Sequence, residues 1–163
     1  MIAVVGIGNP LRADDGAGPR AAEFLRCSLP EERVSVVASP CDPGRLFDAV
    51  DGCEAAFILD ACTGGEPGEV HVWAGDPRGL AHSLQAHHFS LSDGAGAASS
   101  HGFGLVHAIE LGCSLGALPP RLWVVAVSGS SFELGEPMSR PVRLGAIRAA
   151  WCVIGEVSQW LSD

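Results

Sequence analysis

The chain has 163 residues, of which 47% are apolar and 18% charged, a composition that fits one folded domain and argues against disorder. The formal net charge is −9, and all ten basic residues are arginines scattered along the chain, so no basic stripe points to nucleic-acid binding. The N-terminus lacks the basic start of a signal peptide, and no apolar run is long enough to cross a membrane, so we expect a cytoplasmic protein.

The first half of the chain alternates short apolar runs with helical segments. Residues 2–5 form a strand-like run that stops at a glycine-rich turn. Pro19 fits the first turn of a helix that reaches about Arg26. Further along, we predict a strand over 34–38, a short helix over 46–50, a strand over 56–59 that ends at Asp60, and a half-exposed strand over 70–73.

The second half begins with a segment that has no clear periodicity. Residues 74–100 are rich in glycine, serine, histidine and alanine, and we predict a long loop there. Apolar residues at helical spacing predict a helix over 102–114, and a continuous apolar run predicts a strand over 122–127. The final helix runs from Val142 to Leu161 and carries an apolar stripe.

Strands that alternate with helices predict an α/β fold. We expect a single three-layer domain over residues 1–163, with a twisted, mainly parallel sheet between helices. In such folds ligands bind beyond the carboxyl ends of the strands, so polar residues at these ends are the first candidates for a site.

Six cysteines are spread along the chain without a closely spaced pair. A chain of this size does not need disulfides, and a zinc ribbon is not expected at this spacing. We therefore expect mostly buried, reduced thiols. Cys62 lies near Asp60 and could act as a nucleophile, but buried thiols are more common than catalytic ones.

Polar clusters follow the predicted strands or precede a helix. Asp60 ends an apolar strand, so its carboxylate needs a cation, N–H donors or a proton, although a helix cap or a salt bridge to arginine would also satisfy it. His101 precedes a predicted helix whose dipole favours the neutral imidazole that a metal ligand requires, although a surface histidine is the simpler interpretation. The clusters are residues 9–18, Asp60, His101 and residues 128–131.

The adjacent acids Asp14 and Asp15 allow two interpretations. They could form a solvated turn that caps the next helix. Alternatively, one acid faces inward as a metal ligand and the other faces outward as a cap or substrate contact. Two carboxylates and one imidazole would suit nickel, zinc or cobalt better than calcium, and three protein ligands would leave positions for water or substrate.

Other catalytic motifs are weak. The turn from Gly6 to Gly8 lacks the third glycine of a nucleotide-binding fingerprint, and a chain without lysine has no Walker lysine. The serines of residues 128–131 are not set in the Gly-x-Ser-x-Gly elbow of a serine hydrolase.

Taken together, these segments resemble the nickel–iron hydrogenase maturation proteases. The similarity covers almost the whole chain in the right order, and the first motif is the most specific. The matching segments are residues 6–18 (GIGNPLRADDGAG), 58–61 (ILDA), 100–105 (SHGFGL) and 131–135 (SFELG), followed by the terminal helix.

The resemblance implies an activity and a site. Members of this family remove the C-terminal extension of the hydrogenase large-subunit precursor after nickel has been installed. Their metal-binding and catalytic positions correspond to Asp15, Asp60 and His101. The nickel would be carried by the substrate and recognised as a checkpoint, with another divalent metal as an alternative in vitro. We expect a monomer whose partner is that precursor, with no nucleic-acid or membrane partner.

One segment departs from the family pattern. Several relatives carry an acid after the second strand, where this chain has residues 38–41 (ASPC), and Asp42 lies just beyond. This departure motivates a second hypothesis, a module that binds nickel-loaded subunits without cutting them. A third hypothesis is a metallohydrolase with its own resident zinc.

Overall fold

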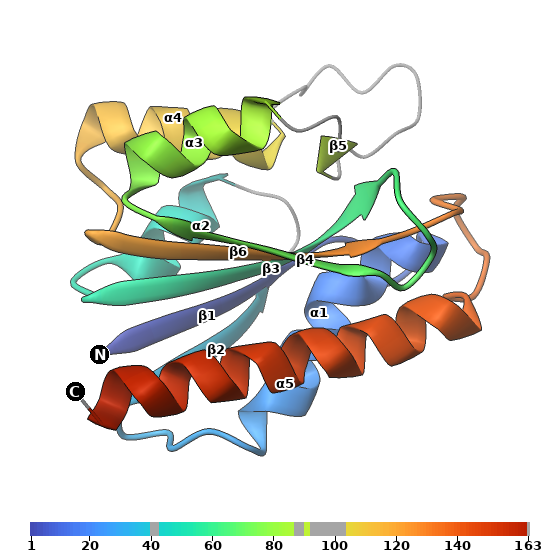
Figure 1. Ribbon diagram of the computed structural model, residues 1–163, viewed down its shortest axis with the longest axis horizontal. Coiled ribbons are helices and arrows are strands. Elements are labelled where there is room, and N and C mark those ends of the chain that lie inside the picture. The colour runs from blue at the N-terminus through green and yellow to red at the C-terminus, as the bar shows by residue number, and fades with distance from the viewer. Residues whose placement is uncertain (40–42, 87–89, 92–103, 163) are drawn as a thin grey trace.

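The computed structural model describes residues 1–39, 43–86, 90–91 and 104–162. Figure 1 shows their arrangement. The strands are β1 (Ile2–Ile7), β2 (Val34–Ser39), β3 (Ala55–Thr63), β4 (Val70–Gly75), β5 (Ser90–Leu91) and β6 (Arg121–Ser128). The helices are the 3₁₀ turn η1 (Ala13–Gly16), α1 (Ala17–Arg26), α2 (Pro43–Val50), α3 (Pro77–Ala86), α4 (Leu105–Leu115) and α5 (Arg140–Ser162).

The strands form one sheet in the order β2-β1-β3-β6-β4. β2, β1, β3 and β6 are parallel, whereas β4 at the edge runs antiparallel to β6. The short β5 pairs antiparallel with the end of β3. The central strands are almost continuously buried, as expected for parallel strands covered on both faces. The predicted mainly parallel sheet is confirmed.

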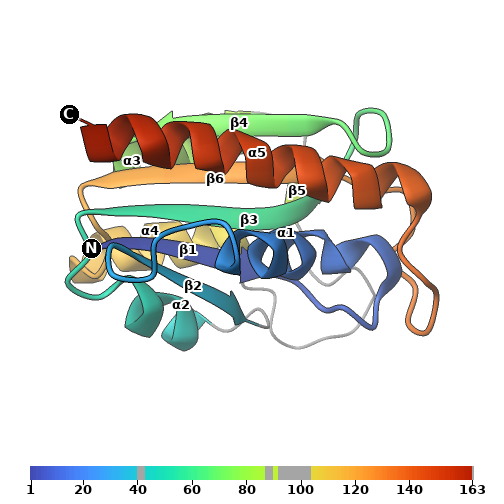
Figure 2. The same cartoon turned by 90° about the horizontal axis from the view of Figure 1, so that it is seen from below.

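Helices cover both faces of the sheet. Figures 1 and 2 show α1 and α5 on one face and α2, α3 and α4 on the other. Successive strand residues alternate between the two cores: Phe57 packs toward α1 and α5, and Ile58 toward the opposite helices. Phe57 stacks on Trp123 of β6 with 4.5 Å between ring centroids. The predicted three-layer α/β fold is confirmed.

The start of α1 lies directly against the ends of β1 and β3. A Cβ atom at Gly18 would overlap the carbonyl oxygens of Ile7 and Leu59, so only glycine permits this approach. The close contact brings η1, which immediately precedes α1, against β3. The turn that carries Asp14 and Asp15 is therefore held at the carboxyl edge of the sheet.

The prediction of a loop over residues 74–100 is wrong over the described residues 77–86 and 90–91, and residues 87–89 and 92–100 lie outside the described residues. Helix α3 occupies Pro77–Ala86 and buries Leu80, Ala81 and Leu84 in the core on its side of the sheet. These three positions have helical spacing, but the small and polar residues between them obscured the pattern. The short strand β5 also falls in this segment.

Several other elements begin at different residues from those predicted; helix α2, for example, begins at Pro43 rather than at residue 46. Helix α4 begins at Leu105 with Gly104 as its N-cap, rather than at residue 102. The terminal helix begins at Arg140, slightly before the predicted Val142. Within the described ranges, no helix combines the length and hydropathy needed to span a membrane.

The prediction of mostly buried thiols is also wrong. Among the cysteines that the structure describes, only Cys62 is buried. Cys53 and Cys113 are partly exposed, and Cys27 and Cys152 are exposed on helical surfaces or their ends. All five are free thiols, and Cys41 lies outside the described residues.

Candidate functional site

Asp15 and Asp60 lie at the same end of the sheet, where the parallel strands have their carboxyl ends. Asp60 is near the carboxyl end of β3, and Asp15 belongs to η1, which follows the neighbouring strand β1 and contacts β3. Their exposed fractions are 3% for Asp15 and 1% for Asp60. The structure therefore brings two buried carboxylates to the position where ligands bind in open α/β sheets.

Local hydrogen bonds hold the carboxylate of Asp15. Its Oδ2 accepts the backbone N–H of Asn9 at 2.8 Å, and the side chain of Asn9 in turn accepts the N–H of Leu11 at 2.9 Å. Gly8 has a φ of 132°, and a Cβ there would overlap the carbonyl oxygen of Asp15. The glycine and the asparagine of the Gly-Asn-Pro segment thus fold the turn around Asp15.

Asp60 has one oxygen engaged with its own strand. Asp60 Oδ1 accepts the N–H of Ala61 at 2.8 Å. The other oxygen, Asp60 Oδ2, and its counterpart Asp15 Oδ1 are both buried from solvent. Buried carboxylates of this kind are stabilised by cations or by several hydrogen-bond donors. As hard oxygen donors they suit a divalent ion, so the donor chemistry present here fits the predicted metal contact.

The third predicted ligand, His101, lies outside the described residues, as does Asp42. Within the part of the chain that the structure describes, no three His, Cys, Asp or Glu side chains gather as metal ligands. Asp15 and Asp60 are thus the two members of the predicted site that the structure places.

The prediction that one acid of the Asp14–Asp15 pair faces outward is wrong, because Asp14 is also buried. Its exposed fraction is 0%, and its carboxylate accepts backbone N–H groups from Ser130 at 2.9 Å, Ser131 at 3.3 Å and Ser139 at 2.8 Å. Burial alone would raise the pKa of Asp14, but these hydrogen bonds outweigh it and hold the pKa below its usual value. Asp14 ties the loop after β6 to the turn after β1.

Backbone strain accompanies this anchor. Ala13, just before Asp14, has a φ of 48°, in the left-handed region that costs an alanine roughly 1–2 kcal/mol. The N–H of Asp14 donates to the carbonyl of Ser131 at 3.0 Å. The contacts of Asp14 with the loop after β6 offset the strain and fix the direction of the chain as it enters η1.

A chain of polar side chains extends beside Asp60. Ser128 Oγ lies 2.9 Å from His71 Nε2 and 3.7 Å from Cys62 Sγ. Asp60 pairs with Ala126 of β6, and Ala126 pairs with His71 of β4, so these three side chains project from one face of the sheet. His71 was not among the predicted site residues, because its alternation with Val70 and Val72 favours an outward histidine, whereas in the structure Val72 is the exposed residue.

This polar chain lacks the features of an activated nucleophile. Burial raises the pKa of Cys62 to about 11, so its thiol is protonated at neutral pH. The hydroxyl of Ser128 is fully buried. Glu69 lies 3.9 Å from the same His71 nitrogen that contacts Ser128, so Glu69 is not placed as the acid of a catalytic triad, which contacts the other ring nitrogen.

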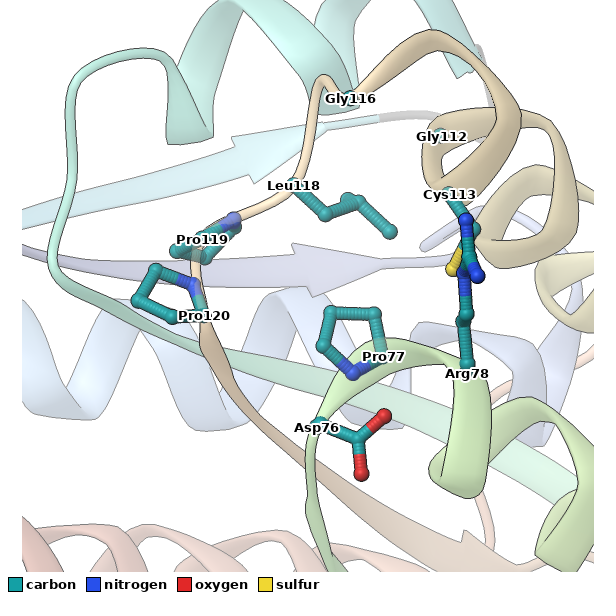
Figure 3. A pocket seen from close by; sticks show the side chains of 9 residues that line it. All are labelled: Asp76, Pro77, Arg78, Gly112, Cys113, Gly116, Leu118, Pro119 and Pro120. Atoms are coloured by element: carbon teal, nitrogen blue, oxygen red, sulfur yellow. The ribbon is translucent and has the colours of Figure 1, made fainter.

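A cavity of about 310 Å³ lies at the other end of the sheet. Figure 3 shows it between the start of α3, the end of α4 and the prolines that precede β6. Asp76, which lines the cavity, follows Gly75, and Gly75 pairs with Leu122 of β6. Leu122 lies four residues, or about 13 Å, along β6 from Ala126, the residue that pairs with Asp60. Burial raises the pKa of its Cys113 thiol, so a reactive thiolate is not favoured there. The cavity is separate from the carboxylate pair.

Solved structures share this architecture over nearly the whole chain. The [NiFe] hydrogenase maturation protease HybD from Thermococcus kodakarensis matches with a TM-score of 0.74 and 23% identity, covering 94% of this chain and 97% of that one. This chain has the maturation protease fold. The hydrogenase maturating endopeptidase HybD from E. coli matches with a TM-score of 0.73 and 22% identity, covering 97% of this chain and 92% of its own.

A third maturation protease structure agrees. HycI from Thermococcus kodakarensis KOD1 matches with a TM-score of 0.67 and 23% identity, covering 94% of this chain and 90% of that one. No protein-family model matches the chain, and no curated protein matches it significantly. The resemblance found in the sequence motifs is thus confirmed at the level of the maturation protease fold.

Proposed function

We propose that this protein is an endopeptidase that removes the C-terminal extension of a nickel-loaded hydrogenase large-subunit precursor. The observation that carries the proposal is the pair of buried carboxylates, Asp15 and Asp60, at the carboxyl edge of a sheet with the maturation protease fold. The sequence motifs around these two residues, and around His101, support the same activity.

In this proposal the side chains of Asp15, Asp60 and His101 contact the nickel that the substrate carries. The two carboxylates supply hard oxygen donors, and the imidazole supplies a nitrogen donor. Contact with the substrate's own metal would position the adjacent peptide bond and reject precursor that lacks nickel. The hydrogen bonds of Asn9 and Asp14 hold the turn, so that Asp15 is placed before the substrate arrives.

The test is a substitution that removes charge without changing shape. Asp60→Asn should lower the rate of precursor processing by about 100-fold or more, because a neutral amide is a poor metal ligand. Asp76→Asn is the matched control: Asp76 is exposed, caps α3 through the N–H of Gly79, and lies at the far end of the sheet. Asparagine also caps helices, so this variant should process normally.

Processing is measured by release of the C-terminal peptide, and folding by thermal unfolding of each variant. Unchanged cleavage by a folded Asp60→Asn protein would contradict the assignment of Asp60. A stable complex with nickel-loaded precursor but no released peptide from wild-type protein would instead indicate the non-cleaving binding module. Tight stoichiometric zinc in the purified protein would favour the metallohydrolase.

A further inference from the structure

Two leucines near the carboxylate pair are unusually exposed. Leu11 has an exposed fraction of 70%, and Leu134 one of 69%. Leu11 lies in the turn after β1, and Leu134 in the loop after β6. Single exposed leucines are common on protein surfaces, but these two lie on two segments that hydrogen bonds connect to each other.

Backbone and side-chain hydrogen bonds join the two segments into one surface. The carbonyl of Leu11 accepts the N–H of Gly135 at 2.9 Å, and Arg12 Nε donates to the carbonyl of Phe132 at 3.2 Å. We call residues 9–12 and 131–136 together the leucine platform. Beneath it, the buried carboxylate of Asp14 binds the backbone of Ser130 and Ser131.

This anchoring lowers the cost of binding through the platform. A loop held at several points loses little conformational entropy when a partner covers it, so exposed apolar side chains on it contribute more net affinity than on a loose loop. The hydrogen bonds of the buried Asp14 carboxylate to Ser130, Ser131 and Ser139 anchor these loops and offset the strain at Ala13.

The platform is also continuous with the candidate site. Asn9, which belongs to the platform, donates its N–H to the carboxylate of Asp15. Both platform segments follow strands at the carboxyl edge of the sheet, where Asp60 lies. The platform thus shares Asn9 with the candidate site and lies at the same end of the sheet, where a polypeptide bound at the two carboxylates can also contact it.

We propose that the leucine platform is the docking surface for the folded body of the substrate protein, which contacts it through apolar side chains next to the segment that is cut. This inference rests on the proposed endopeptidase function and adds to it the surface that selects the substrate. Contacts made in both the ground state and the transition state affect substrate binding rather than the chemical step.

The test compares Leu11→Ser, Leu134→Ser and the double variant with Leu115→Ser as control. Leu115 is 64% exposed at the end of α4, at the opposite edge of the sheet. The double variant should raise the KM for nickel-loaded precursor about tenfold or more while kcat stays within about twofold. Leu115→Ser should change neither, and because all three leucines are exposed, every variant should keep the wild-type unfolding temperature.

An unchanged KM in the folded double variant would overturn the docking assignment. So would a fall in kcat alone, which would place the leucines in the chemical step. If the double substitution instead converts a dimer to a monomer in sedimentation while KM is unchanged, the occupant is a second copy of this chain and the proposal is wrong. Failure of the proposed function is seen separately, as wild-type protein that neither binds nor cleaves the precursor.

Discussion

Asp14 and Asp15 are adjacent in the chain but have different roles. Both are buried, yet Asp14 is engaged by three backbone N–H groups from the loop after β6, whereas Asp15 takes the N–H of Asn9 and stands at the sheet edge with Asp60. The first is a structural anchor and the second a candidate ligand.

Asp14→Asn should destabilise the protein in a pH-dependent way. At neutral pH we expect a loss of about 2–3 kcal/mol, because charged hydrogen bonds to buried amides are weakened. The folded pKa of Asp14 is lowered, so its contribution is fully present above its ordinary value of 3.8 and is lost as the pH falls through the folded pKa. Urea unfolding of both proteins from pH 7 to about pH 3 measures the difference.

The difference in unfolding free energy between wild type and Asp14→Asn should shrink below about pH 4. Asp48→Asn, at an exposed position on α2, is the control and should match the wild type throughout. A difference that stays constant into the acid range would show that the charge of Asp14 does not stabilise the folded state.

Residue roles were only partly predictable from the sequence. The placement of Asp60 followed from the apolar strand before it, and that of Asp15 from its turn. The burial of Asp14 depends on Ser139, 125 residues away, and no local pattern reports such a contact. The alternation of β4 did not report the inward direction of His71, because it favours turning Val70 and Val72 inward, whereas Val72 is exposed. The pairing of His71 with Ser128 follows from the register of β4 on β6.

At the scale of elements, the position of α1 decides the site. Its first turn rests on the carbonyl oxygens of β1 and β3, where Gly18 leaves no room for a Cβ. A Cβ atom at Gly6 of β1 would likewise overlap the carbonyl oxygen of Gly18. Any side chain at this contact would push α1, and the turn that carries Asp15, away from Asp60.

Gly18→Ala should therefore destabilise the protein by about 3 kcal/mol, since the new methyl group meets backbone that cannot rotate away. Processing should fall by roughly 100-fold, because a shift of about 1 Å displaces Asp15. Gly155→Ala is the matched control. Gly155 is in α5 with open space around it, so alanine there should stabilise the helix by about 0.8 kcal/mol.

Chemical unfolding and the processing assay measure both effects. Wild-type stability in the Gly18→Ala protein would contradict the close contact between α1 and the strand ends. A destabilised variant with normal processing would show that the position of Asp15 is less critical than the proposed site requires.

Strands and the terminal helix were predictable because their apolar patterns are long or continuous. Helix α3 was missed because its buried positions are few and separated by small or polar residues. The antiparallel direction of β4 could not be predicted either, since alternation reports which side of a strand is buried but not which way the strand runs.

For the whole molecule, the order of strands brings together what the chain separates. β1 and β3 are neighbours in the sheet, and β6 lies beside β3, so the segments after β1 and β6 meet at the edge where Asp60 lies. The α/β class and this edge were predictable from the alternation of strands and helices. The joining of the two loops through Asp14 and the leucine platform is a tertiary contact that sequence patterns do not encode.

The most direct test of the proposed function is the intact mass of the hydrogenase large-subunit precursor. Nickel-loaded and nickel-free precursor, with nickel content measured beforehand, are each incubated with and without this protein. Loss of the C-terminal extension is expected only when nickel-loaded precursor and protein are combined. No loss from the nickel-loaded precursor would contradict the endopeptidase assignment, and equal loss from both forms would contradict recognition of the metal.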